Sequence, residues 1–410
     1  MAENDAVTAR INGIAAGGAG LARAAGKTIF IAGTAPGELV RCRIVEERRS
    51  WARAELLEII EASPERVQGY CEWYGICGGC NLQHIRYAGQ LAVKAAILQD
   101  AFSRIGGFSP PEPEVIAGNP WEYRNRVQFH RIDPDTPVAR TGGAAGGRAR
   151  FGLKAAKSGN VAAVADCPVA DRGIRFALQT AARGGAVFEP PPDKSRFTVY
   201  ARNGLFLSEG GIQRGVTQIL DQDITLDAGV FFQSNGAMLE LLIAALRETA
   251  ERADRNLPMA DMYCGVGIFA RFLAGLFPRV DLVEENKNAL PLARENLLPL
   301  AACGTQTECF ALRDDEWVRL KTGGTQAGKG GAGYGFMVVD PPRQGLSPLL
   351  SRWIASNGPP LLAYVSCDPA TLARDSKILR AGGYVLSELR LYDFYPQTAH
   401  IESLAIFNKN

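Results

Sequence analysis

The sequence predicts an α/β fold in which a doubly wound, Rossmann-like sheet follows a small N-terminal β-barrel and a central region with clustered cysteines. The sheet is predicted because short apolar strands, glycine-rich turns and helices alternate from about Val230 onward. The barrel is predicted because short β-rich runs are evenly spaced between Val7 and Ile60. We therefore divide the chain into an OB-like barrel (1–62), a central domain (63–229) and a sheet domain (230–410).

The composition is that of a globular protein. With 47% hydrophobic and 21% charged residues, 410 residues predict two to three folded domains and exclude a fibrous or disordered chain. The net charge is only +2, so any contact with nucleic acid must come from a local patch. No apolar run is long enough for a membrane span, and the first ten residues lack an apolar segment. We expect a soluble, cytoplasmic monomer without membrane contacts.

The predicted strands of the barrel are Thr28–Ile31, Glu38–Val45 and Trp51–Ile60, separated by glycine and proline. Residues 1–60 carry eight basic and seven acidic side chains, so their charge gives no separate support for RNA binding. A purely structural barrel is therefore an alternative to an RNA-binding one.

The central region combines a predicted helix (Tyr87–Ile105), two predicted surface loops (141–147 and 189–193) and a basic stretch. Residues 121–160 hold eight Arg or Lys against three acidic residues. Four aromatic residues lie among these cations: Trp121, Tyr123, Phe129 and Phe151. This mixture is typical of a groove that binds single-stranded RNA. The alternative is a solvated basic face beside aromatic residues of the core.

The third region reads as strand, turn and helix in repetition. The predicted strands are Met259–Tyr263, Arg279–Val283, Thr307–Leu312, Phe336–Val339 and Leu361–Ser366. The predicted helices are Ile268–Phe277 and Asn286–Leu298. The glycine-rich segment 322–335 is a predicted surface loop. This order is typical of a doubly wound sheet, which binds ligands at the carboxyl ends of its strands.

Gly265 and Gly267 lie between the first strand and its helix, where backbone can approach a ligand. Glu284 closes the next strand and follows Asp261 by 23 residues, close to the usual offset for a ribose-binding acid. Ala270 occupies the third glycine position of a pyrophosphate loop. The pattern therefore favours S-adenosylmethionine, which has no phosphates, over NAD. Glycines that serve only helix packing are the alternative.

Two residues late in the chain, a cysteine and a glutamate, are of the types that are needed to methylate carbon 5 of uracil. This carbon is a poor nucleophile until a thiolate adds at carbon 6, and a base must then remove the carbon-5 proton. Cys367 follows a predicted strand directly, and Glu402 lies near the C-terminus. Cys264 competes as the nucleophile, but its place in the glycine-rich loop favours a packing role. The segment Asp340-Pro341-Pro342-Arg343 ends the strand before that of Cys367, and it contains no cysteine.

Cys71, Cys77 and Cys80 are closely spaced, and Cys167 lies far downstream. Three thiolates and a distant fourth suit either an iron-sulfur cluster or a four-cysteine zinc site, and their spacing does not choose between the two. His84 is expected to be structural. Cys42, Cys303 and Cys309 belong to neither group.

These residues together resemble the RumA/TrmA group of RNA 5-methyluridine methyltransferases, in its branch with a TRAM domain and an iron-sulfur cluster. The resemblance covers nearly the whole chain. Its motifs are Gly18–Arg23 with Gly26–Ile31, Gly75–His84, Tyr123–Arg126, Phe231–Asn235, Asp261–Gly267, Asp340–Arg343, Ser366–Pro369 and Pro396–Glu402.

The resemblance implies roles for particular residues. Cys367 would be the nucleophile and Glu402 the base. The S-adenosylmethionine site would be lined by Gln233, Tyr263, Glu284 and Asp340, with Asp314 as a further candidate. A [4Fe-4S] cluster would be held by Cys71, Cys77, Cys80 and Cys167. Ile268 departs from the family, which usually has a small polar residue there.

The resemblance leaves the RNA open. Members with both a TRAM domain and the cluster mostly modify 23S ribosomal RNA, and this is the substrate we expect. Relatives with the cluster act on the T-loop of tRNA, which is the alternative substrate. A metal-bearing RNA-binding protein without catalysis is a third reading, and the presence of Cys367 and Glu402 argues against it.

Overall fold

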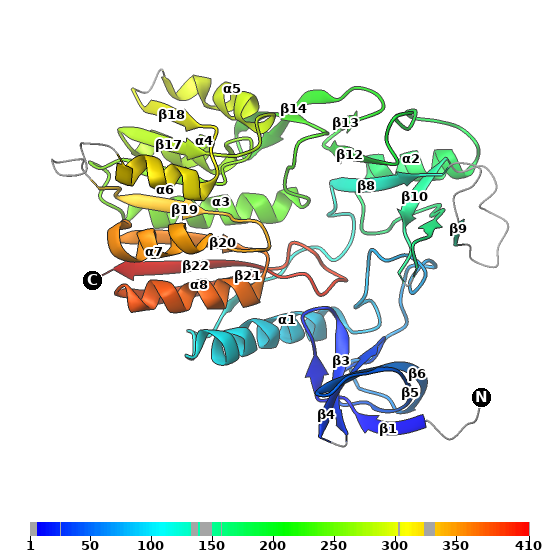
Figure 1. The fold of residues 1–410 in the computed structure, drawn as a ribbon. Helices are drawn as coiled ribbons and strands as arrows, with labels where there is room; N and C mark the ends of the chain where they lie inside the picture. The colour runs from blue at the N-terminus through cyan, green and yellow to red at the C-terminus, as the bar shows by residue number, and fades with distance from the viewer. Residues whose placement is uncertain are drawn as a thin grey trace.

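The computed structural model describes residues 6–24, 26–132, 138–139, 150–156, 158–301, 304–323 and 333–409. Figure 1 shows the N-terminal barrel in blue, the central sheet in cyan to green, and a large sheet with its helices in green to red. The predicted loop 141–147 and most of the loop 322–335 lie outside the described residues, as do Arg140, Arg148, Lys157 and Cys303.

The N-terminal domain is a six-stranded sheet of order β1-β5-β6-β4-β3-β2. Its strands are β1 (Ala6–Arg10), β2 (Gly13–Ile14), β3 (Ala19–Ala24), β4 (Lys27–Ala32), β5 (Leu39–Glu47) and β6 (Trp51–Glu61). Because β1 also contacts β3, the sheet closes on itself around Ile29, Ile31, Val40 and Cys42. The predicted barrel is confirmed.

The central domain is built on a second six-stranded sheet, of order β13-β12-β8-β10-β11-β9. Its elements are β8 (Arg126–Arg131), β9 (Val138–Ala139), β10 (Phe151–Lys154), β11 (Val161–Ala162), α2 (Arg172–Ala182), β12 (Arg196–Arg202) and β13 (Leu205–Ser208), and a hairpin of β14 (Arg214–Ile219) and β15 (Gln222–Asp227) follows. The loop predicted at 189–193 is present.

Three of the four aromatic residues predicted to stack on RNA belong to the core instead. Phe129 is fully buried, Phe151 is 4% exposed, and both pack in one cluster with Phe197 and Phe188. Tyr123 is also buried. Burial excludes these rings from stacking on a nucleotide, so the predicted stacking surface is wrong for them, and the alternative of core aromatics holds.

The third sheet has eight strands in the order β18-β17-β16-β19-β20-β22-β21-β7. The first five are parallel, and β22 is antiparallel to both of its neighbours. The strands are β7 (Glu114–Ile116), β16 (Met259–Met262), β17 (Arg279–Val283), β18 (Gln306–Phe310), β19 (Phe336–Val339), β20 (Leu361–Ser366), β21 (Tyr384–Tyr392) and β22 (Glu402–Lys409). Although β7 precedes the central sheet in the chain, it pairs with β21 at the edge of this one.

Helices cover both faces of this sheet, as a doubly wound fold requires. One apolar cluster joins the sheet to α3 (Gly236–Glu251), α4 (Ile268–Leu273) and α5 (Ala289–Ala301). The other joins it to α1 (Tyr87–Ala101), α6 (Asp314–Gly323), α7 (Pro348–Asn357) and α8 (Pro369–Ala381). A π-helical turn, Phe102–Gly106, extends α1, and a 3-10 turn, Ala274–Leu276, extends α4. The predicted α/β architecture is confirmed.

Candidate active site

The loop between β16 and α4 allows backbone to approach a ligand. Tyr263, Gly265 and Gly267 have φ angles of 63°, 55° and 76°, in the left-handed region. A Cβ on Gly267 would lie 2.9 Å from Leu297 Cδ1 and 3.2 Å from Ala293 Cα, so α5 leaves space only for glycine. The space around Gly265 is open. Gly267 therefore serves packing, and Gly265 is the position where the backbone is accessible.

Glu284 follows β17 directly and lies beside this loop. Its Oε2 accepts a hydrogen bond from the Gly265 N–H at 2.9 Å, and its Oε1 accepts one from the Asn286 N–H at 2.7 Å. Each oxygen keeps a second lone pair. The backbone thus fixes the carboxylate while leaving it able to accept hydrogen bonds from a diol.

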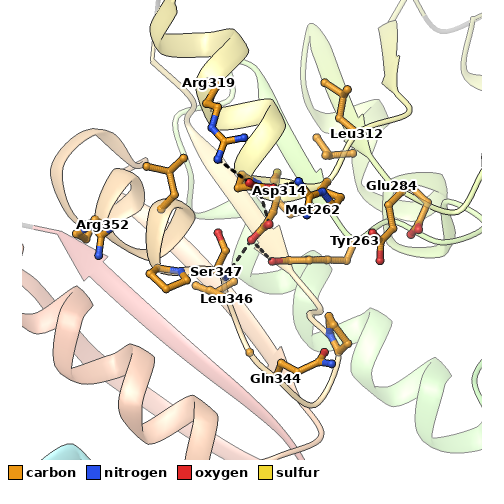
Figure 2. A pocket seen from close by; sticks show the side chains of 18 of the residues that line it. Met262, Tyr263, Glu284, Leu312, Asp314, Arg319, Gln344, Leu346, Ser347 and Arg352 are labelled. Carbon is orange, nitrogen blue, oxygen red and sulfur yellow. Dashed lines mark hydrogen bonds and ion pairs between the residues drawn. The ribbon is translucent and has the colours of Figure 1, made fainter.

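A cavity of about 630 Å³ opens next to Glu284 at the carboxyl ends of β16, β17 and β19. Figure 2 shows Tyr263 and Asp314 pointing toward one another within it, and the Tyr263 hydroxyl donates to Asp314 Oδ2 at 2.6 Å. The same oxygen accepts the Ser347 N–H at 2.9 Å. Asp314 therefore joins the loop after β16 to the start of α7, and Oδ2 is already used by the protein.

Gln233 and Asp340 form a second group, outside the lining of this cavity. The Gln233 Nε2 lies 3.4 Å from Asp340 Oδ2. Burial raises the pKa of Asp340 to about 7, and the hydrogen bond from Gln233 opposes this rise. The five residues predicted to bind the cofactor thus divide into three that line the cavity and a pair outside it, of which Asp340 influences the pKa of Cys367.

Cys367 and Glu402 lie at adjacent ends of two neighbouring strands. Cys367 follows β20, Glu402 begins β22, and the strands pair so that Ser366 lies opposite Ser403. Glu402 is only 4% exposed. The two residues are 35 positions apart in the sequence, and the antiparallel pairing brings them to one edge of the sheet.

Burial dominates the charge state of both groups. It raises the pKa of Cys367 to about 12, and the nearby carboxyl groups of Glu402 and Asp340 add to that rise. Burial also raises the pKa of Glu402 well above its usual value, again with a contribution from Asp340. Arg343 lowers the pKa of both groups. Without RNA, the Cys367 thiol is therefore predominantly neutral at pH 7, and the Glu402 carboxyl group holds its proton to a higher pH than an exposed carboxyl group does.

Cys264 is 3% exposed and belongs to the apolar cluster of α3, α4 and α5. Burial raises the pKa of its thiol far above the usual value. The packing role expected for Cys264 is confirmed. Ile268 is buried in the same cluster.

Arg343 and His400 stand in the motifs Asp340–Arg343 and Pro396–Glu402, but the sequence alone indicates no role for either residue. Arg343 Nη2 and His400 Nδ1 are 3.0 Å apart. Their closeness in sequence to Asp340 and Glu402 was the available signal.

All four predicted cluster cysteines line a separate cavity of about 250 Å³ in the central domain, together with Arg124. Burial raises the pKa of Cys77 and Cys80 to about 11 and of Cys167 to about 12, while Arg124 lowers all three. The thiols are free. Within the described ranges, no set of three or more His, Cys, Asp and Glu side chains has the arrangement of a metal site. The structure thus brings the cysteines to one cavity without forming a coordination shell.

His84 joins the cysteine segment to the barrel. Its Nε2 lies 3.0 Å from the Thr34 carbonyl oxygen, and its Nδ1 lies 2.5 Å from the Tyr74 hydroxyl. The structural role expected for His84 is confirmed.

Comparison with known proteins shows two matching families and several similar chains. The tRNA (Uracil-5-)-methyltransferase family matches residues 216–410, and the TRAM domain matches residues 3–57. An uncharacterized RNA methyltransferase of Treponema denticola is 31% identical, and the match covers 94% of each chain. A 23S rRNA (uracil(1939)-C(5))-methyltransferase of Edwardsiella ictaluri is also 31% identical, over 95% of this chain and 93% of that protein. The chain belongs to the RNA uracil-C5 methyltransferase family.

One solved structure has the same fold as this chain over nearly its whole length. Pyrococcus abyssi tRNA (uracil-54, C5)-methyltransferase, in complex with S-adenosyl-L-homocysteine, matches with a TM-score of 0.70 and 21% identity, over 98% of this chain and 100% of that chain. In the described parts of the chain, none of the helices has the length and apolarity to cross a membrane. The RNA uracil-C5 methyltransferases use S-adenosylmethionine, and the family resemblance inferred from the motifs is confirmed.

Proposed function

We propose that this protein methylates carbon 5 of one uridine in 23S ribosomal RNA through a covalent adduct with Cys367. The observation that carries the proposal is that Cys367, directly after β20, and Glu402, at the start of the paired strand β22, lie at one edge of the sheet. The choice of ribosomal RNA rests on the relatives named as 23S rRNA methyltransferases, which match over almost the full length of this chain. The relative named for tRNA supports only the fold at its 21% identity.

S-adenosylmethionine, when bound, supplies an electrophilic methyl group. Glu284, Tyr263 and Asp314 would hold it in the 630 Å³ cavity, where the fixed Glu284 carboxylate fits a ribose diol. Asp340, with its partner Gln233, is close enough to Cys367 to raise the pKa of the thiol, so the two would bind where cofactor and uracil meet. The residues present therefore fit the cofactor.

The chain's own groups carry out the remaining steps. The Cys367 thiolate attacks carbon 6 of uracil, a C–S bond forms, and the π electrons move toward carbon 5 and oxygen 4. After carbon 5 has been methylated, the Glu402 carboxylate removes its proton. The electrons of the broken C–H bond restore the double bond, the C–S bond breaks, and the Cys367 thiolate is released.

The buried environment of Glu402 is consistent with a base for a carbon acid. Burial raises the pKa of the carboxyl group, so the carboxylate binds a proton more strongly than an exposed one does. Cys367 must lose a proton and Glu402 must be ionised for the reaction, and Arg343 favours both of these forms because it lowers the pKa of each group.

The substrate is tested by mapping 5-methyluridine in RNA from a strain that lacks this gene. We expect its loss from one nucleotide of 23S ribosomal RNA and its return when the gene is restored. The Cys367→Ala gene should fail to restore it. Loss from the T-loop of tRNA, with ribosomal RNA unchanged, would contradict the ribosomal substrate and favour the alternative.

We further propose that Cys71, Cys77, Cys80 and Cys167 hold a [4Fe-4S] cluster. The donor set fits, because four free thiols line one cavity and Arg124 lies with them to balance negative charge. A zinc ion is the alternative for a four-cysteine set.

Protein purified without oxygen should therefore be brown, with a broad absorbance near roughly 400 nm and about four irons per chain. Cys77→Ser should lose the iron because one of four ligands is removed. Cys309→Ser, which changes a cysteine of β18 in another domain, should retain it. One zinc per chain with no iron in anaerobic material would contradict the cluster.

Glu284→Ala should weaken S-adenosylmethionine binding by about 1 to 3 kcal/mol, the scale of a lost charge-assisted hydrogen bond. RNA affinity should barely change. Calorimetric titration with the cofactor measures the effect, and Glu308→Ala, which removes an exposed carboxylate of β18, is the control. Unchanged affinity in folded Glu284→Ala protein would rule out the ribose role.

A further inference from the structure

A cation and a neutral ring meet beside the two reactive groups. Arg343 lies three residues after Asp340, past the end of β19, and His400 lies two residues before Glu402. The Arg343 Nη2 and the His400 Nδ1 are 3.0 Å apart. Because the guanidinium group can only donate, His400 Nδ1 is the acceptor of this hydrogen bond.

Arg343 counteracts a cluster of acidic groups around the nucleophile. The carboxyl groups of Glu402, Asp340 and Asp368 all raise the pKa of Cys367, whereas Arg343 lowers it. Arg343 also lowers the pKa of Glu402. The reaction needs Cys367 as the thiolate. The orientation of this guanidinium group therefore affects how readily the enzyme starts its reaction.

Arg343 and His400 are both exposed, and fixing a long exposed side chain such as that of Arg343 costs rotamer entropy. Its partner is held in place by a tight turn. The His400 N–H donates to Thr398 Oγ1 at 3.2 Å, and the Thr398 hydroxyl donates to the Tyr395 carbonyl at 2.8 Å. The His400 ring also contacts the Tyr395 ring edge-on, with centroids 5.6 Å apart. The ring is thus a fixed point from which Arg343 can be oriented.

The surroundings of His400 keep the ring neutral. His400 is exposed, but desolvation by the groups around its ring lowers its pKa to about 4, and the charges of Arg343, Arg124 and Lys94 add to this. A protonated ring could not accept a hydrogen bond and would repel the guanidinium group. Throughout the neutral range, His400 therefore presents a lone pair to Arg343.

We infer that His400 is a positioning residue for the reaction: its Nδ1 holds the Arg343 guanidinium group near Cys367 and Glu402 and thereby favours the Cys367 thiolate. This inference rests on the proposed function, in which Cys367 is the nucleophile. His400 itself contacts Arg343 and Tyr395, and it takes up no proton in the reaction.

The test measures the rate at which iodoacetamide alkylates Cys367 as a function of pH, with the modified peptide identified by mass spectrometry. The full-length, metal-loaded enzyme is used without RNA. His400→Leu should displace the rising limb of the rate profile, and hence its midpoint, to higher pH by about one unit, which slows alkylation at neutral pH roughly tenfold. The displacement is measured between about pH 7 and 10, below the Cys367 pKa of about 12, where the rate is proportional to the thiolate fraction. His400→Gln offers an amide oxygen as acceptor and should restore most of the rate. A purely structural role would give no such rescue.

Three further variants test whether His400 and Arg343 act through the same interaction. Arg343→Leu should reproduce the shift of His400→Leu, and the double variant should shift no further, because both changes remove the same interaction. Lys377→Leu removes an exposed cation of α8 and should leave the midpoint unchanged. An unchanged midpoint in His400→Leu, or additive shifts in the double variant, would overturn the inference. If the RNA adduct of the enzyme forms at a cysteine other than Cys367, the proposed function fails instead.

Discussion

A Glu402→Gln enzyme incubated with its RNA and S-adenosylmethionine should accumulate a methylated protein–RNA adduct that survives denaturing electrophoresis. Glutamine cannot take the carbon-5 proton, so the C–S bond to Cys367 cannot break after methylation. The side chain keeps nearly the same volume at a site that is 4% exposed, so the strand pairing should be retained. Radiolabel from the methyl group should migrate with the protein.

Two cysteine variants identify the nucleophile. Cys367→Ala should form no adduct and lose activity by several orders of magnitude, as expected for the loss of a covalent nucleophile. Cys264→Ala should still form the adduct, because Cys264 is buried in the apolar cluster of α3, α4 and α5. Methylation by Cys367→Ala, or an adduct mapped to Cys264, would contradict the mechanism. A protein that only binds RNA would form no adduct in any variant.

Much of the sheet and its site could be predicted because the signals are local. Strands β19 and β20 have the predicted bounds, since each is a short apolar run between breaking residues. In a parallel sheet, residues that follow such strands gather at one edge. That rule places Glu284, Asp340 and Cys367 together without any knowledge of contacts between distant residues.

Features that depend on long-range pairing could not be predicted. Strand β7 has only three residues and finds its partner β21 almost 280 positions later. The basic stretch of the central domain gives another example. In β8 the alternation of Val127, Gln128 and Phe129 shows that Val127 and Phe129 share one face of the strand. It does not show whether that face packs in the core, as it does against Phe188 and Phe197, or faces an RNA, because this depends on residues distant in sequence.

Among the cofactor residues too, local relations could be predicted and long-range contacts could not. Composition and spacing placed Glu284 correctly beside the glycine-rich loop, because that offset is a local property of the fold. The hydrogen bond from the Tyr263 hydroxyl to Asp314 connects two residues that are 51 positions apart, and no pattern in either segment indicates it.

A buried ion pair joins α1 to the segment before Glu402, and its loss should strongly destabilise the protein. Lys94 and Asp393 are both completely buried, and their Nζ and Oδ1 atoms are 2.5 Å apart. The Lys94 ammonium also donates to the Tyr395 carbonyl at 2.9 Å. Burial lowers the pKa of Lys94, and Asp393 opposes this change. The pair therefore holds the catalytic segment against a helix that comes from the other end of the chain.

Lys94→Met should lower the free energy of unfolding by about 3 to 5 kcal/mol, because it leaves the Asp393 carboxylate buried without its partner. Urea denaturation measures the change. Arg10→Met breaks the exposed pair with Glu61 and should cost less than about 1 kcal/mol, since exposed pairs contribute little.

The double variant Lys94→Met/Asp393→Leu separates charge burial from loss of packing. Replacing both charged groups by apolar ones removes the unpaired charge, so most of the lost stability should return. Methylation should recover less than stability does, because the Tyr395 carbonyl still lacks the ammonium group that fixes the segment leading to His400 and Glu402. If the double variant is as unstable as Lys94→Met, packing of the lysine stem rather than the buried carboxylate causes the loss. If its activity returns in full, the ion pair contributes to stability alone and does not position the catalytic segment.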